Sequence, residues 1–266
     1  MSELFKPGLD ILQPEWRGQG PKNVDMLFTC RNGGVSSGPW GGADGVMGLN
    51  VGNHVGDAES CVRMNRQIVA QLVPSDPKWI KQVHGANIVE ADKTDPTVEA
   101  DAAWTRTPGV VCVVMVADCL PVLLADAEGQ IVAAVHAGWR SLASGVIQRT
   151  VARMQSEMGR PLTLKAWLGP RIGPESFEVG KEVLDAVRAT LPHAEEAFKP
   201  AMDSEHYYAD LGELARLALE GSGLDPKNIV DCRLSTYTDP NRFYSYRRDG
   251  EKSGRHAAMV WIKPAQ

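Results

Sequence analysis

No stretch of this 266-residue chain approaches the ~18 uninterrupted apolar residues that a membrane-spanning helix requires. The amino terminus also lacks a basic segment followed by an apolar one, which is the pattern of a secretory signal. Basic residues are not in excess, because 28 Lys and Arg stand against 33 Asp and Glu, a net charge of -5. These absences predict a cytoplasmic protein that binds neither membrane nor nucleic acid.

Paired cysteines are lacking as well. The chain has five cysteines, an odd number, and no C-x-x-C motif; they are Cys30, Cys61, Cys112, Cys119 and Cys232. Scattered single cysteines favour free thiols in a reducing compartment over a disulfide framework.

What the chain does have is two apolar runs that each end in reactive residues. Val110–Ala117 leads into Asp118 and Cys119, and residues 131–135 lead into His136. Uninterrupted runs of Val, Ile and Ala predict strands that are buried on both faces. Cys119 and His136 are therefore expected near the ends of neighbouring strands in one sheet.

A third candidate ligand precedes these runs. His84 interrupts a short β-prone stretch, residues 79–89. Two neutral imidazoles and one thiolate suit zinc, and three protein ligands leave a fourth position open for water or substrate. The separations of 35 and 17 residues match no local metal motif. Taken one at a time, these residues favour a buried apolar Cys119 and hydrogen-bonded structural histidines over metal ligands.

The remaining pattern indicates the fold class. Helical periodicity covers residues 58–72, 142–158, 180–191 and 210–220, and strand-like runs cover residues 25–29, 164–168, 229–234 and 256–262. Strands and helices are interspersed without strict βαβ alternation, which predicts an α/β (α+β) protein with mixed sheets covered by helices. No internal repeat or linker stands out, so one domain is expected over residues 1–266.

Long motifs along the whole chain resemble one known family. They are QVHG (Gln82–Gly85), ADAAWTRTPGV (Ala100–Val110), ADCLPV (Ala117–Val122), HAGWR (His136–Arg140), FTCRNGGVS (Phe28–Ser36), LNVGNHVGD (Leu49–Asp57), LGPRIGPESFEVG (Leu168–Gly180) and FYSYRRDGEKSGR (Phe243–Arg255). The chain resembles the YfiH family, also called the laccase-domain or multicopper polyphenol oxidase family and, more recently, the purine nucleoside phosphorylase family. This resemblance implies a layered α/β/β/α fold, in which two mixed sheets pack face to face between helices.

The resemblance also implies a site. It makes His84, Cys119 and His136 ligands of a metal, usually zinc, with copper as a possible alternative. It adds Gln82 to the substrate-binding residues and Cys119 to the catalytic ones. The implied partners are a purine nucleoside and phosphate, and the protein is expected to act as a monomer.

Two positions are candidates for binding an anion or substrate. Gly33 and its neighbour Gly34 allow close backbone approach, so the resemblance makes the flanking Arg31 and Ser36 substrate-binding candidates. Without the resemblance, a glycine-rich surface turn is the favoured interpretation of this stretch. Arg140 is the last residue of the HAGWR motif and lies beside the start of a predicted helix, where it is expected to bind phosphate and take part in catalysis, or else to pair structurally.

Three classes of function remain open. The first is a zinc-dependent purine nucleoside enzyme that phosphorolyses adenosine, inosine and methylthioadenosine and deaminates adenosine, with Asp118 as a general acid or only a structural acceptor. The second is a copper-dependent polyphenol oxidase. Six histidines and no H-x-H pair argue against its four-copper form, which needs roughly ten. The third is a thiol hydrolase or amidase that edits peptidoglycan precursors, with Cys119 as nucleophile.

Overall fold

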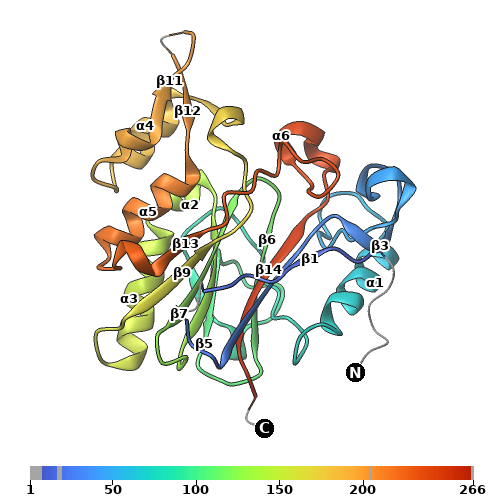
Figure 1. The fold of residues 1–266 in the computed structure, drawn as a ribbon, viewed down its shortest axis with the longest axis horizontal. Helices are drawn as coiled ribbons and strands as arrows, with labels where there is room; N and C mark the ends of the chain where they lie inside the picture. The colour runs from blue at the N-terminus through green and yellow to red at the C-terminus, as the bar shows by residue number, and fades with distance from the viewer. Residues whose placement is uncertain (1–7, 17–19, 204, 265–266) are drawn as a thin grey trace.

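Two β-sheets lie face to face in the computed structural model, and helices cover both outer faces (Figure 1). The structure describes residues 8–16, 20–203 and 205–264. Helix α1 lies on one side, and α2, α3 and α5 lie on the other (Figure 1). The layered α/β/β/α arrangement is confirmed. We retain the prediction of a single domain over residues 1–266, part of which lies outside the described residues.

The elements have the following bounds. The strands are β1 Ile11–Leu12, β2 Val24–Thr29, β3 Asn32–Ser36, β4 Ile88–Glu90, β5 Ala102–Thr105, β6 Val111–Val116, β7 Leu120–Asp126, β8 Val132–Ala137, β9 Leu164–Leu168, β10 Glu178–Gly180, β11 Phe198–Pro200, β12 His206–Ala209, β13 Ile229–Asp231 and β14 His256–Ile262. The α-helices are α1 Glu59–Ala70, α2 Trp139–Ala143, α3 Val146–Met158, α4 Lys181–Arg188, α5 Leu211–Gly221 and α6 Tyr246–Asp249.

The two large sheets differ in strand direction. The six-stranded sheet has the order β13-β9-β7-β8-β5-β4 and is mixed, because its two end pairs are parallel and its inner pairs are antiparallel. The four-stranded sheet has the order β1-β2-β14-β6 and is antiparallel throughout. The expectation of two mixed sheets therefore holds for one of them. A small antiparallel sheet, β10-β12-β11, was not predicted.

The core lies on both sides of each large sheet. Every residue of β6 and β8 is buried, as the uninterrupted apolar runs predicted, and every residue of β7 is buried as well. Along β14, Ala258 and Val260 pack between the sheets, whereas Met259 and Trp261 face the layer that contains α1. Alternate residues thus fill two separate apolar layers, as the period of an extended strand requires. This packing gives the site a rigid frame.

The chain crosses from one sheet to the other between β6 and β7. We expected the run Val110–Ala117 to be a neighbour of the strand that carries His136. Instead, β6 belongs to the four-stranded sheet and β7, which was not predicted, pairs with β8. Asp118 and Cys119 form the connection, and Asp118 has a positive φ of 82°. Cys119 still precedes a direct neighbour of β8, so its expected place beside His136 is correct.

The helix predicted over residues 142–158 is two helices. Gly145 separates α2 from α3 and has a left-handed φ of 74°, a conformation that breaks the helical path and that glycine adopts without strain. Helix α1 lies within its predicted range, and α5 extends one residue beyond its predicted end. Across the described residues, no helix combines the length and the apolarity needed to cross a membrane.

Candidate metal centre and cavity

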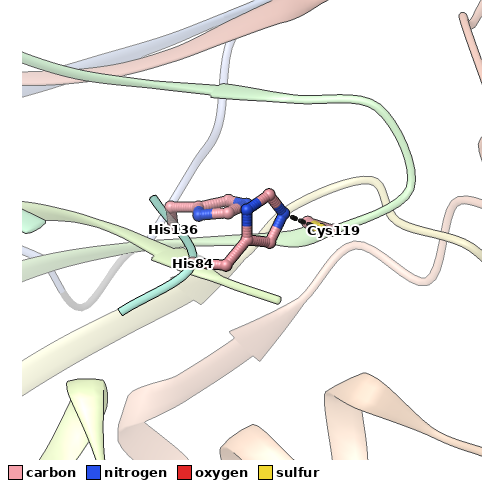
Figure 2. A group of neighbouring side chains, drawn as sticks. All are labelled: His84, Cys119 and His136. Atoms are coloured by element: carbon pink, nitrogen blue, oxygen red, sulfur yellow. Dashed lines mark hydrogen bonds between the residues drawn. The ribbon is translucent and has the colours of Figure 1, made fainter. Parts of the chain in front are cut away.

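Three side chains from separate segments converge at the start of β7 and the end of β8, the central strands of the six-stranded sheet (Figure 2). His84 lies in the loop before β4, Cys119 immediately precedes β7, and His136 lies near the end of β8. One potential ligand atom from each residue lies within 4.8 Å of the other two. The Cys119 Sγ is 3.9 Å from the His84 Nε2. The structure therefore brings together the three ligands that the resemblance implied.

Strand pairing explains why residues so distant in sequence meet. Pro121 in β7 lies opposite His136 in β8, which brings Cys119 beside the histidine. His84 comes from the loop before β4, and its backbone is left-handed with φ 58°. Such backbone is uncommon for residues other than glycine and must be held by its surroundings. The geometry of the site thus depends on contacts outside the three side chains.

A glycine leaves space at the point where the three side chains converge. A Cβ added at Gly138 would lie 2.9 Å from the Cys119 Sγ, 3.3 Å from the His84 Cδ2 and 3.6 Å from the His136 Cε1. Gly138 has φ -67°, which any residue adopts, so glycine is needed here for space. Tetrahedral zinc with bonds of ~2.0–2.3 Å places its ligand atoms roughly 3.5 Å apart. The donor set and the open space both fit such an ion.

The charges of the metal-free ligands are coupled. Burial opposes ionisation of the Cys119 thiol, but His136 and His84 outweigh burial and lower the pKa of the thiol to about 6. Burial also disfavours the charged form of His136, but the negative charges of Cys119 and Asp101 raise the pKa of its imidazole. Without an ion, thiolate and imidazolium form a pair. Binding a metal at this pair releases the imidazole proton, because only neutral histidine is a ligand.

A cavity of about 960 Å³ opens beside the three side chains. Its aromatic lining residues are Trp79, Trp139, Phe177 and Tyr246. Its arginine lining residues are Arg66, Arg140, Arg247 and Arg255. Among the described lining residues, Asp118 is the one carboxylate. A cavity with aromatic walls and an excess of positive charge suits a planar, anionic or phosphate-associated ligand.

Comparison with known proteins now identifies the family. Residues 25–263 match the family described as multi-copper polyphenol oxidoreductase laccase. The chain is 42% identical to a purine nucleoside phosphorylase of Pseudomonas aeruginosa, over 95% of this chain and 98% of that protein. It is 40% identical to the purine nucleoside phosphorylase YfiH of Escherichia coli, over 95% of this chain and 98% of that protein. The chain belongs to this laccase-domain family.

A solved structure of the laccase-domain family agrees with this assignment. The crystal structure of a Neisseria meningitidis protein superposes with a TM-score of 0.84 at 40% identity, covering 96% of this chain and 99% of that one. The resemblance inferred from the motifs is confirmed. Both named relatives are purine nucleoside phosphorylases, so the family includes enzymes that act on purine nucleosides.

Two of the predicted substrate-binding residues line the cavity. Arg140 is exposed, and its guanidinium lies 4.3 Å from the centre of the Trp139 ring. It makes no side-chain hydrogen bond or ion pair with another described residue, so its donors are available to a ligand. Gln82 also lines the cavity, but its side-chain amide pairs with the backbone N–H and carbonyl of Met115 at 2.6 and 2.8 Å. Gln82 therefore fixes the wall.

The other two predicted substrate-binding residues, Arg31 and Ser36, are not among the residues that line the cavity. Arg31 donates hydrogen bonds to the carbonyls of Gly41 and Pro240. Ser36 is fully buried, and its hydroxyl donates to the Asp57 carboxylate at 2.6 Å. Their polar atoms already have partners within the protein, so the geometry gives no support to the expected substrate contacts.

Asp118 lines the cavity, but its carboxylate is occupied. It accepts hydrogen bonds from the Thr236 hydroxyl at 2.6 Å, the Ser245 hydroxyl at 2.9 Å and the Arg247 backbone N–H at 2.6 Å. All three contacts come from donors, so both carboxylate oxygens are already engaged as acceptors within the protein. Of the two roles that the sequence left open, the structure favours that of structural acceptor. Asp118 ties the cysteine loop to the segment that carries Arg247.

Several residues that line the cavity were not predicted from the sequence. Arg66 lies on α1, and Arg247 and Arg255 belong to the motif Phe243–Arg255. The motif indicated that this segment matters, but not which of its residues reach the cavity. Their guanidinium groups also bond backbone carbonyls, those of Val51, Glu178 and Ser253 respectively. These bonds hold the walls and leave Arg140 as the least restrained of the four.

Proposed function

We propose that this protein is a zinc-dependent purine nucleoside phosphorylase. Its proposed substrates are adenosine, inosine and methylthioadenosine, and it also deaminates adenosine. The observation that carries the proposal is the combination, in one cavity, of a His-Cys-His ligand set, an unpaired Arg140 and aromatic walls. The names of the relatives support the same class of substrate.

Zinc is the ion that the donor set favours. Two imidazoles and a thiolate with an open fourth position are a catalytic zinc pattern. When bound, zinc supplies Lewis-acid chemistry and lowers the pKa of water near neutrality. His84, Cys119 and His136 would hold it at the edge of the cavity, where substrate has access. Gly138 has no side chain that would crowd these three residues.

Arg140 is the residue that we propose binds phosphate. A guanidinium presents a planar fork of donors that matches phosphate, and the stack on Trp139 orients this fork. In phosphorolysis, an oxygen of hydrogen phosphate bonds to C1′ of the ribose while the bond from C1′ to the purine breaks. The proton of the hydrogen phosphate ends on the released base. Arg140 neutralises the phosphate charge and holds its oxygen beside the sugar.

The aromatic walls of the cavity bind the purine base by stacking. Stacking of a nucleobase on an aromatic side chain contributes about 1–3 kcal/mol and tolerates different bases. Such tolerance suits an enzyme that accepts both adenosine and inosine. Deamination of adenosine uses water at C6 and releases ammonia, so it requires the same base position but no phosphate. One cavity can therefore serve both reactions.

The test is a set of assays on one preparation with measured metal content. We expect the zinc-loaded protein to convert inosine to hypoxanthine only when inorganic phosphate is present, and adenosine to inosine without it. A phenolic dye should be oxidised at background rate, because zinc is redox-silent. Chelation should abolish nucleoside conversion. No nucleoside conversion with zinc fully bound would overturn the proposal.

The same assays separate two other candidates. Saturable phenol oxidation that requires copper would support the oxidase implied by the family's description. A thiol hydrolase is favoured by the 3.9 Å approach of the Cys119 Sγ to the His84 Nε2. Such an enzyme would survive a strong chelator and lose activity with iodoacetamide.

Replacement of Arg140 tests the phosphate subsite. We expect Arg140→Gln to raise the apparent KM for phosphate tenfold or more, since a charge-assisted hydrogen bond contributes about 1.5–3 kcal/mol. Deamination of adenosine should fall less. The matched control is Arg149→Gln, which removes the same charge from an exposed position on α3 outside the cavity. Equal losses in both reactions would show that Arg140 positions the nucleoside instead.

A further inference from the structure

Asp101 is a fully buried carboxylate immediately before β5. Its Oδ1 lies 2.8 Å from the His136 Nδ1 and accepts the His84 backbone N–H at 2.9 Å. Its Oδ2 accepts the Gly85 backbone N–H at 2.6 Å. Its backbone carbonyl accepts the His136 N–H at 2.8 Å. One residue therefore contacts two of the three candidate metal ligands, and contacts one of them twice.

We propose that Asp101 is the positioning residue of the metal centre, which fixes both the tautomer of His136 and the backbone conformation of His84. This inference rests on the proposed metal site and adds a residue that contacts neither the ion nor the substrate. Carboxylates that accept the second N–H of a histidine ligand orient the ring and increase its basicity.

The bond to His136 selects the nitrogen that faces the ion. Because the carboxylate can only accept, the His136 Nδ1 must carry the proton in this contact. The lone pair of the neutral ring then lies on Nε2, which is left for the metal. The other tautomer would present a proton to the ion and lose the bond to Asp101. When metal binding removes one proton from the imidazolium, Asp101 thus retains the other on Nδ1 and leaves Nε2 as the ligand atom.

The hydrogen bonds from the His84 loop to Asp101 stabilise the backbone conformation of His84. His84 has φ 58°, and this left-handed conformation is unfavourable for a residue other than glycine. The carboxylate of Asp101 accepts three consecutive N–H groups, those of Val83, His84 and Gly85, and so stabilises this turn. This turn places the exposed ring of His84 with its centre 4.7 Å from the centre of the His136 ring. The same carboxylate therefore sets the distance between the two imidazoles.

An amide cannot replace this carboxylate. All the side-chain contacts of Asp101 are with N–H groups, and they approach both of its oxygens. In Asp101→Asn, one of the two oxygens becomes an NH₂ group. At the Oδ1 position it would face both the His136 Nδ1–H and the His84 N–H, and at the Oδ2 position it would face the N–H groups of Val83 and Gly85. Either orientation disturbs one ligand while the volume of the side chain is unchanged. We expect zinc affinity to fall by about 10–100-fold.

Asp126→Asn is the matched control. Asp126 is also buried, and its carboxylate accepts the backbone N–H groups of Gln130 and Ile131 at 2.5 and 3.0 Å, in the turn before β8. It has no contact with the metal ligands. This variant should lose stability as Asp101→Asn does, but it should bind zinc as the wild type does. The comparison separates loss of fold from loss of ligand geometry.

The experiment is a competition titration of zinc against a chromophoric chelator, with cobalt spectra of the same proteins. We expect Asp101→Asn to bind weakly and to show a reduced or shifted thiolate-to-cobalt band, while wild type and Asp126→Asn share one spectrum. Wild-type affinity and spectrum in Asp101→Asn would overturn the inference. Failure of the wild type to bind zinc would instead overturn the metal site itself.

A measurement on the wild type keeps the inference testable if Asp101→Asn does not fold. In zinc-loaded protein with ¹⁵N-labelled histidine, NMR distinguishes the protonated ring nitrogen from the metal-bound one. We expect His136 to be protonated at Nδ1 and metal-bound at Nε2. Metal at Nδ1 would exclude the bond to Asp101 and overturn the inference.

Discussion

Cys119→Ala is expected to lose the metal and all nucleoside conversion while the fold survives. The thiolate is the one anionic ligand of the set, and two neutral histidines alone hold zinc weakly. Cys119 lies in the connection between β6 and β7, where its side chain is only partly buried. Removing its sulfur should therefore cost little stability. Metal content after dialysis, circular dichroism and denaturant unfolding measure the two effects separately.

Cys61→Ala is the matched control for this variant. Cys61 is also partly buried but lies on α1, outside the cavity. It should keep about one zinc per chain and full activity. Full occupancy by zinc in Cys119→Ala would remove Cys119 from the ligand set. If the wild type stayed active after its metal was removed, a thiol mechanism would be favoured. In that case Cys119→Ala would lose activity without any change in metal content.

Gly138→Ala is expected to have the second large effect. The added methyl group would lie 2.9 Å from the Cys119 Sγ, which is closer than carbon and sulfur approach without strain. The thiol can rotate away, so the fold tolerates the change, but the sulfur then leaves its ligand position. We expect zinc affinity to fall at least tenfold. Disturbing a residue that supports a ligand lowers metal affinity about 10–100-fold, and displacing the ligand itself should lower it at least as much.

Gly221→Ala provides the control for the added methyl group. Gly221 ends α5, and a Cβ there would meet no atom within 4 Å. This variant should bind zinc as the wild type does and be equally or slightly more stable. Competition titration with a chelator measures the affinities of both variants. Wild-type zinc affinity in Gly138→Ala would show that the three side chains do not converge on an ion at this point.

Local pattern predicted some elements of the fold well and others poorly. Strands β9 and β14 have the predicted bounds, because each is a short apolar run between clear breaks. Strand β7 was missed, since Pro121 cannot donate to a sheet and is uncommon in a central strand. The break at Gly145 was missed as well, because the apolar period continues across it. The antiparallel order of the four-stranded sheet depends on long-range pairing that no local pattern encodes.

The candidate site divides in the same way. His84, Cys119 and His136 were singled out as residues, but their role as a set came from family resemblance, since ligands so far apart leave no local spacing pattern. Asp101 and Arg247 were missed in their roles because their contacts are made only after folding. Arg247 meets Asp118 across 129 positions of the chain. The motif around Arg31 was visible, but sequence alone could not show that its donors bond the protein itself.

The position of β14 has a consequence for how this chain is made. It is the last strand along the described chain, yet it lies between β2 and β6 and is the only described strand that joins them. A ribosome releases β2 and β6 long before β14, so both strands expose unpaired edges during most of synthesis. The segment that precedes β14 also delivers Arg247 and Arg255 to the cavity. The cavity is therefore incomplete until this segment has been made, and the open edges of β2 and β6 are where edge-to-edge association is expected until β14 pairs with them.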